Sequence, residues 1–170
     1  MSKKQRDKMI NEFVDKTMAP LRDKLKALDK QLHSSTSSSE REKLATQIKA
    51  LRFYETTVVS EIRTLHMDYP KSTDVKRVFD NCLEEAANTT KKLKDSRGLV
   101  DIIVDTIKDM ANFCIRVLSG GKTPQFFDTT TKPVDSLQRD AKEIKQNLDQ
   151  FVENVGEIRG APGGPGVSNA

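Results

Sequence analysis

The sequence predicts an all-α protein: an elongated antiparallel helical bundle with a coiled-coil hairpin and about five helices. Apolar residues recur at alternating steps of three and four along most of the chain, which is the spacing of one helix face. Five of the eight glycines and two of the six prolines lie from Gly156 onward, so helix breakers are rare before that point. Charged residues make up 32% of the chain, which is typical of long amphipathic helices and too much for a compact α/β enzyme core.

The first helix is predicted over residues 4–32. Its apolar stripe takes heptad steps from Leu21 onward, and so narrow a seam needs a partner helix to bury it. Pro20 lies inside the pattern, and because proline lacks an amide hydrogen we expect a kink or a break near residues 18–20. The stripe consists of Ile10, Val14, Met18, Leu21, Leu25, Leu28 and Leu32.

The chain's net charge of +4 is located in this first segment. Residues 1–33 contain nine Lys or Arg against five Asp or Glu, and the remaining charges balance. A basic helix can attract phosphate or anionic lipid. The five acids interrupt the bases, however, and this arrangement favours a solvated helix face.

A polar run over residues 33–39 predicts a loop, and a second helix begins at its end. Ser39 followed by Glu42 matches a capping box, in which the serine hydroxyl and the glutamate carboxylate each accept a backbone amide at the helix start. Ser37 followed by Glu40 is the alternative register.

The second helix carries a heptad stripe that only Glu55 interrupts, and we expect the neighbouring Tyr54 to cover that gap. The helix ends before Pro70, since the residue that precedes a proline is driven out of the α region. Two heptad helices joined by a short loop predict an antiparallel hairpin over residues 4–67. The second stripe consists of Leu44, Ile48, Leu51, Glu55, Val58, Ile62 and Leu65.

The third helix is predicted from about Asp74, with Thr73 or Ser72 as its cap, to a stop near Gly98. A fourth helix over residues 99–118 is the most apolar segment of the chain. Its polar residues follow one stripe, which favours a helix in the middle of a bundle with one face in water over a membrane-spanning or membrane-surface helix. The stripe consists of Asp101, Asp105, Lys108, Asp109, Asn112 and Arg116.

Residues 119–124 predict a turn. Their Gly-Lys-Thr sequence resembles the end of a phosphate-binding loop, but Arg116 stands where that motif has its first glycine, and Pro124 removes an amide that the phosphate would need. We expect Phe126 and Phe127 to fix this turn on the bundle.

The fifth helix opens with Pro133 in its first turn and has the most regular heptad stripe in the sequence. From Gly156 onward there is too little apolar surface to bury. We therefore expect a single domain over residues 1–158, with a three-helix part at 72–158, and a flexible tail at 159–170. The fifth stripe consists of Leu137, Ala141, Ile144, Leu148, Phe151, Val155 and Ile158.

No pattern of catalytic, metal-binding or cofactor-binding residues is present in the sequence. His33 and His66 are the two side chains that titrate near neutrality, and neither has a ligand at zinc-like spacing. Cys82 and Cys114 fall in apolar helix patterns, which is typical of small buried side chains. Nucleic-acid binding is not expected, because no tryptophan is present and no tyrosine accompanies the basic segment.

Residues 96–150 resemble a module of helical, coiled-coil effectors from Legionella-type bacteria. The resemblance lies in the segment 96–103, the apolar helix after it, the Gly-Gly-Lys turn at 120–122, the segment 125–129 and the heptad helix that follows. It implies delivery by a type IVB (Dot/Icm) secretion system from the bacterial cytoplasm into a host cell. It assigns no site residue.

These observations predict a non-enzymatic helical protein that binds a host or bacterial protein through helix contacts. The candidate partner-binding residues are Leu137, Ile144 and Leu148, and the alternative is that every seam is buried within the chain. Peripheral attachment to a membrane, through the first helix or residues 99–118, is a second hypothesis. Self-association through the long stripes and an enzyme site assembled only by folding also remain open.

Overall fold

The computed structural model describes residues 2–66, 71–118 and 132–160, with side chains left aside at 132–138 and 158–160. Within these ranges the chain forms five helices and no strand, which confirms the all-α helical bundle. The helices are α1 (Lys3–Ser34), α2 (Ser38–Arg63), α3 (Ser72–Lys92), α4 (Arg97–Leu118) and α5 (Lys132–Gly160).

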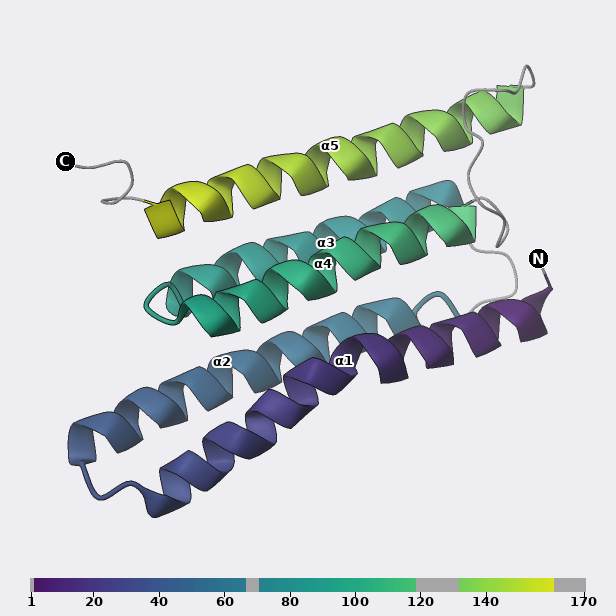
Figure 1. Ribbon diagram of the computed structural model, residues 1–170. Coiled ribbons are helices and arrows are strands. Elements are labelled where there is room, and N and C mark those ends of the chain that lie inside the picture. Colours follow the sequence, from purple (N-terminus) through teal and green to yellow (C-terminus); the bar gives the residue numbers. More distant parts are fainter. Residues whose placement is uncertain (1, 67–70, 119–131, 161–170) are drawn as a thin grey trace.

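The helices stack in three layers, and neighbours in sequence run antiparallel (Figure 1). The α1–α2 hairpin forms one outer layer, α3 and α4 form the middle layer, and α5 lies alone on the other side. Contacts of α1 with α4 and of α2 with α3 join the hairpin to the middle layer, while α5 packs on both α3 and α4.

Helix α1 continues through Pro20 without a break, and Figure 1 shows it changing direction about halfway along its length. The expected kink is therefore present, whereas the alternative of a break is wrong. Proline cannot donate to the carbonyl one turn earlier, and its ring crowds that carbonyl, so the helix bends there. Because of the bend, the second half of α1 follows α2 and diverges from α4 (Figure 1).

Several predicted helix ends differ from the observed ones. Helix α2 uses the alternative cap, since the Ser37 hydroxyl accepts the amide of Glu40 at 3.4 Å. Helix α3 begins earlier than expected, with Lys71 at the cap position and its amide bound to the Asp74 carboxylate at 2.8 Å. Neither predicted cap, Thr73 or Ser72, is used. Side-chain capping is a local choice among adjacent polar residues, and spacing alone does not settle it.

Glycines that were expected to mark helix ends lie inside helices. Helix α3 ends at Lys92, and Gly98 belongs to the first turn of α4. Helix α5 runs through Gly156 to Gly160, past residue 159 where the tail was expected to begin, and residues 161–170 lie outside the described part of the chain. A glycine within a helix costs only about 1 kcal/mol relative to alanine, and burial of Val155 in the same turn offsets this.

Helix α4 is the centre of the core. Its apolar residues are buried by α1, α3 and α5, while the predicted polar stripe is exposed except at half-buried Asp101. The expectation of a central helix with one wet face is confirmed. Its buried residues are Leu99, Val100, Ile103, Val104, Thr106, Ile107, Met110, Ala111, Phe113, Cys114, Val117 and Leu118.

The polar interruption in the α2 stripe is resolved by two contacts. Tyr54 is fully buried, as expected, and its hydroxyl lies 2.6 Å from that of Thr106 on α4. Thr106 donates its own hydrogen to the Ile103 carbonyl at 2.7 Å, so Tyr54 must be the donor to Thr106. Glu55 accepts from the Arg22 guanidinium on α1 at 2.5 Å, which gives the polar seam position an ionic partner.

Candidate functional site

The regular stripe of α5 faces the protein's own core. Ile144 is completely buried, and Leu148 is half-buried and packs against the same core. The Leu137 side chain lies outside the described residues. Two of the three candidate partner-binding residues therefore contact α5's neighbours, because a lone helix on top of two others must bury its apolar stripe against them. This matches the alternative in which the seam is buried within the chain.

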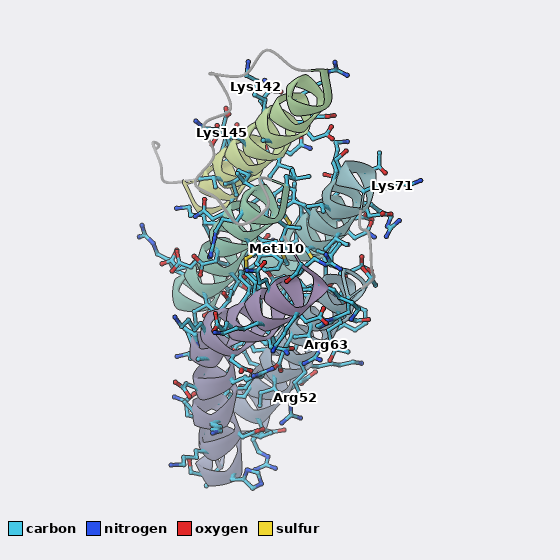
Figure 2. The ribbon with its side chains drawn as sticks, turned by 90° about the vertical axis from the view of Figure 1, so that its right-hand side faces the viewer. Arg52, Arg63, Lys71, Met110, Lys142 and Lys145 are labelled. Atoms are coloured by element: carbon cyan, nitrogen blue, oxygen red, sulfur yellow. The ribbon has the colours of Figure 1, made fainter. Side chains whose placement is uncertain are left out.

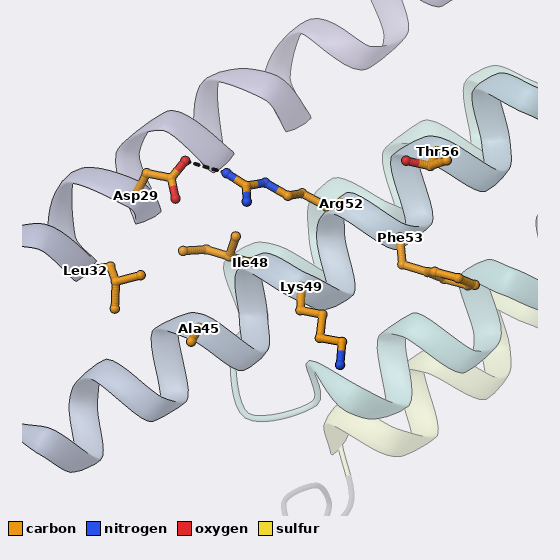
Figure 3. A pocket seen from close by; sticks show the side chains of 8 residues that line it. All are labelled: Asp29, Leu32, Ala45, Ile48, Lys49, Arg52, Phe53 and Thr56. Carbon is orange, nitrogen blue, oxygen red and sulfur yellow. Dashed lines mark hydrogen bonds and ion pairs between the residues drawn. The ribbon is translucent and has the colours of Figure 1, made fainter.

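A different surface, on the outer face of α2, offers a hollow of about 490 Å³ (Figure 3). Asp29 and Leu32 of α1 form one side, and the other lining residues come from α2. Leu32, Ala45 and Ile48 provide an apolar floor, because the second half of α1 and the first half of α2 bury only the centre of their shared seam. The α2 lining is Ala45, Ile48, Lys49, Arg52, Phe53 and Thr56.

Phe53 lies beside this hollow and is 57% exposed. It is the one large hydrophobic side chain that is exposed in the described part of the chain. A single exposed apolar residue is ordinary on a protein surface. Here, however, it adjoins an apolar floor, and together they provide a place where a partner's side chain can be desolvated.

Bases outnumber acids on this face, and its one acid in the described residues, Asp29, comes from α1. The exposed residues of α2 between Ala45 and Thr64 include three bases, Lys49, Arg52 and Arg63, and no acid. Both acids of this stretch turn towards neighbouring helices: Glu55 binds Arg22, and Glu61 accepts from the Asn81 amide at 2.9 Å.

Among these bases only Arg52 has an ionic partner in the described residues, the Asp29 carboxylate at 2.8 Å (Figure 3). Arg52 is exposed and Asp29 is half-buried, so water still screens their attraction. The face consequently presents positive charge around its one exposed aromatic ring.

A second hollow, of about 310 Å³, lies between the first half of α1 and the end of α4. The Phe13 and Phe113 rings meet there with centroids 4.4 Å apart. Its rim mixes both signs of charge, with Lys16 and Arg116 beside Glu12 and Asp109. Desolvation by the surrounding side chains, and then the nearby Asp105, raise the pKa of the exposed Asp109 carboxyl above its ordinary value. A rim of mixed charge selects no one class of charged ligand.

A polar cluster joins the first turn of α1 to the end of α2. The Asp7 carboxylate lies 2.8 Å from both the Lys3 ammonium and the His66 ring, and buried Arg6 donates to the Leu65 carbonyl at 3.2 Å. The hydrogen bonds from Lys3 and His66 lower the pKa of Asp7 below its ordinary value. Sequence spacing gave no sign of this contact, since Asp7 and His66 are 59 positions apart.

The two cysteines and His33 are the remaining reactive side chains discussed above, and their surroundings are those of structural residues. Cys82 and Cys114 are buried free thiols, as expected, and burial raises the pKa of each. The His33 ring is bound to the Asp29 carbonyl at 2.7 Å on an exposed helix end. Within the described residues no group of three or more His, Cys, Asp or Glu side chains is arranged to hold a metal ion.

The turn at 119–124 and the two phenylalanines after it lie outside the described residues, so the interpretation of that segment stays a prediction.

The chain was also compared with known proteins. No protein-family model, curated protein or solved structure matches it.

Proposed function

We propose that the protein is a non-enzymatic helical module that binds another protein. The observation that carries this proposal is the outer face of α2, where Phe53 is 57% exposed beside an apolar floor and among three bases. Aromatic and arginine side chains beside a small hollow are the features that dominate binding energy in protein interfaces. The α5 stripe does not carry the proposal, because Ile144 is inside the core.

The resemblance of residues 96–150 to Legionella-type effectors supports a further part of the proposal. On that basis the protein is made in a bacterial cytoplasm, passes through a type IVB secretion system and meets its partner in a host cell. A reporter fused to the chain tests this part directly. Signal inside host cells is expected from a strain that has the secretion system, and none from a strain that lacks it.

Binding is tested by crosslinking and pull-down from host-cell extract with the folded protein. Recovery of one specific protein supports the proposal. The matched control is Ile144→Asp, which disrupts the core and should lose any capture that depends on the fold. Failure of the wild type to crosslink any protein in either host or bacterial extract would remove the proposal's support.

Peripheral membrane binding is the second candidate, and the same α2 face is the observation that favours it, because bases around an aromatic side chain can attract anionic lipid. The two helices first considered for this role offer less, since the apolar stripes of α1 and α4 are buried in the core. None of the helices in the described ranges is long and apolar enough to cross a membrane. Flotation with anionic vesicles separates this candidate from protein binding.

A further inference from the structure

We infer that the outer face of α2 binds an acidic, amphipathic helical segment of the partner protein, with an apolar side chain of that segment seated against Phe53. This inference rests on the proposed protein-binding function and specifies its surface and the chemistry of its partner. The face is defined by Lys49, Arg52, Phe53 and Arg63, together with the hollow beside them.

Charge is the first argument for an acidic partner. The three bases lie along one side of α2, and Lys49 and Arg63 are separated by about 21 Å at the helical rise of 1.5 Å per residue. Both are exposed, and in the described part of the chain neither side chain forms an ion pair. A row of acids on a helix of roughly 14 residues would face the whole row of bases.

Shape and polarity are the second argument. Leu32, Ala45 and Ile48 form a concave apolar floor, and Phe53 stands at its edge (Figure 3). A protruding aliphatic side chain of a partner helix can enter this hollow and contact Phe53 at its edge. An anionic bilayer presents no such protrusion. In the described residues Phe53 is the one large apolar side chain available for insertion, and interfacial helices need a broader apolar face than that.

A second copy of this chain is the alternative that the charges also allow. Asp149, Glu153 and Glu157 form an exposed acidic stripe on α5, with steps of four residues. The same face of α5 carries Gln146, Gln150 and Asn154 and has no exposed apolar side chain in its described residues to meet Phe53. The outer face of α2 therefore fits a segment that has both acids and an apolar residue better than it fits α5.

The experiment uses the full chain and synthetic helical peptides of roughly 14 residues. The test peptide has glutamates around two leucines one turn apart. One control peptide replaces the leucines with glutamine, and a second replaces the glutamates with lysine. Binding is measured by fluorescence anisotropy at low and at physiological salt, and circular dichroism verifies the fold of each variant.

The wild type is expected to bind the test peptide more tightly than either control peptide, and more weakly as salt rises. The double variant Lys49→Glu, Arg63→Glu should weaken binding at least about tenfold and reduce its salt dependence. Phe53→Ala should weaken binding about fivefold or more and leave the salt dependence unchanged. The matched control is Lys145→Glu on exposed α5, far from Arg52 in Figure 2, which should change binding less than about twofold.

Three results overturn the inference. The first is that the wild type does not bind the test peptide, or that the wild type and the α2 variants bind it with equal affinity. The second is flotation on phosphatidylserine vesicles that requires Phe53 and Lys49, in the absence of peptide binding. The third is self-association, seen by light scattering, that Lys49→Glu abolishes, since a second copy would then occupy the face.

The outcome for this face is distinguishable from the outcome for the proposed function. If the wild type crosslinks a host protein and the α2 variants crosslink it equally well, protein binding stands and the α2 assignment is wrong. If the peptide binds as expected but no protein is captured from any extract, the α2 assignment stands and the proposed function loses its support.

Discussion

The two halves of α1 share one continuous apolar stripe but have different surroundings. The first half packs on α2 and also contacts α4, where Phe13 meets Phe113. The second half bends away after Pro20 and follows α2. Up to the bend, the buried stripe residues of α1 are at most 1% exposed, whereas the buried stripe residues beyond the bend and those of α2 opposite them are 4–7% exposed. The first set is Ile10, Val14, Met18 and Leu21 next to the bend, and the second is Leu25, Leu28, Leu44 and Ile48.

The difference shows that a two-helix hairpin buries one seam and leaves its flanks wet, while a third helix is needed to exclude water from a core. The same incomplete burial leaves Leu32 and the floor beside Phe53 accessible. The stable core and the candidate binding face are thus products of the same heptad pattern with different numbers of neighbours. Four sets of substitutions test this comparison, from the largest expected effect to the smallest.

Ile144→Asp tests the fully enclosed region. An aspartate at this completely buried position has no cationic partner, so we expect the free energy of unfolding to fall by about 4 kcal/mol or more. Urea unfolding followed by circular dichroism measures the loss. The control is Gln146→Asp, which adds the same charge at an exposed position of α5 and should change stability by less than about 0.5 kcal/mol. Equal stability of the two variants would contradict the packing of α5.

Leu51→Ala and Leu44→Ala compare the two regions directly, because both leucines are in the α2 stripe. Leu51 is completely buried, and its loss should cost about 4 kcal/mol, while Leu44 lies in the two-helix part and should cost about 2 kcal/mol. In Leu44→Ala the other residues at this end of the hairpin can move into the space that the leucine leaves, which lowers the cost. Urea unfolding of the two variants side by side makes the measurement, and a larger cost at Leu44 would reverse the comparison.

Tyr54→Phe tests the junction between the hairpin and the central helix. The substitution removes the hydroxyl that donates to Thr106 and leaves Thr106 bound to the Ile103 carbonyl, so the expected cost is about 1 kcal/mol. Thr106→Val instead leaves the buried Tyr54 hydroxyl without its acceptor and should cost about 2 kcal/mol. Thermal unfolding of both variants checks the order, and a costlier Tyr54→Phe would show that the hydroxyls have other partners.

Asp7→Asn tests the contact between the first turn of α1 and the end of α2. The pKa of Asp7 in the folded protein lies below its ordinary value of 3.8, because Lys3 and then His66 bind the carboxylate. The charged carboxylate therefore stabilises the folded protein above that value, and the stabilisation is lost as pH falls through the lower, folded-state pKa. Wild type should exceed Asp7→Asn in urea stability at about pH 6, and the two should converge as pH falls through the lowered, folded-state pKa of Asp7. A difference that persists in acid would indicate a cause other than this carboxylate.

The candidate surface was only partly accessible to sequence reasoning. Phe53 lies on the side of α2 opposite to the stripe, and an aromatic residue at such a position is the signal that could have identified it. The stripe of α5, by contrast, predicted the helix correctly and gave no means of deciding which surface would cover Ile144. The contact of Asp7 with His66 could not be predicted, because it depends on how two distant helix ends meet.

The sequence by itself determined the secondary structure, the hairpin and the wet face of α4, because the three- and four-residue spacing of apolar side chains is a local property of each helix. Only the tertiary structure decided which stripes are enclosed. It paired Glu55 with Arg22, placed Ile144 inside the core and left the α2 face with Phe53 exposed. The burial of a side chain depends on which helices lie next to it. A heptad pattern indicates that a helix needs a partner but does not identify that partner.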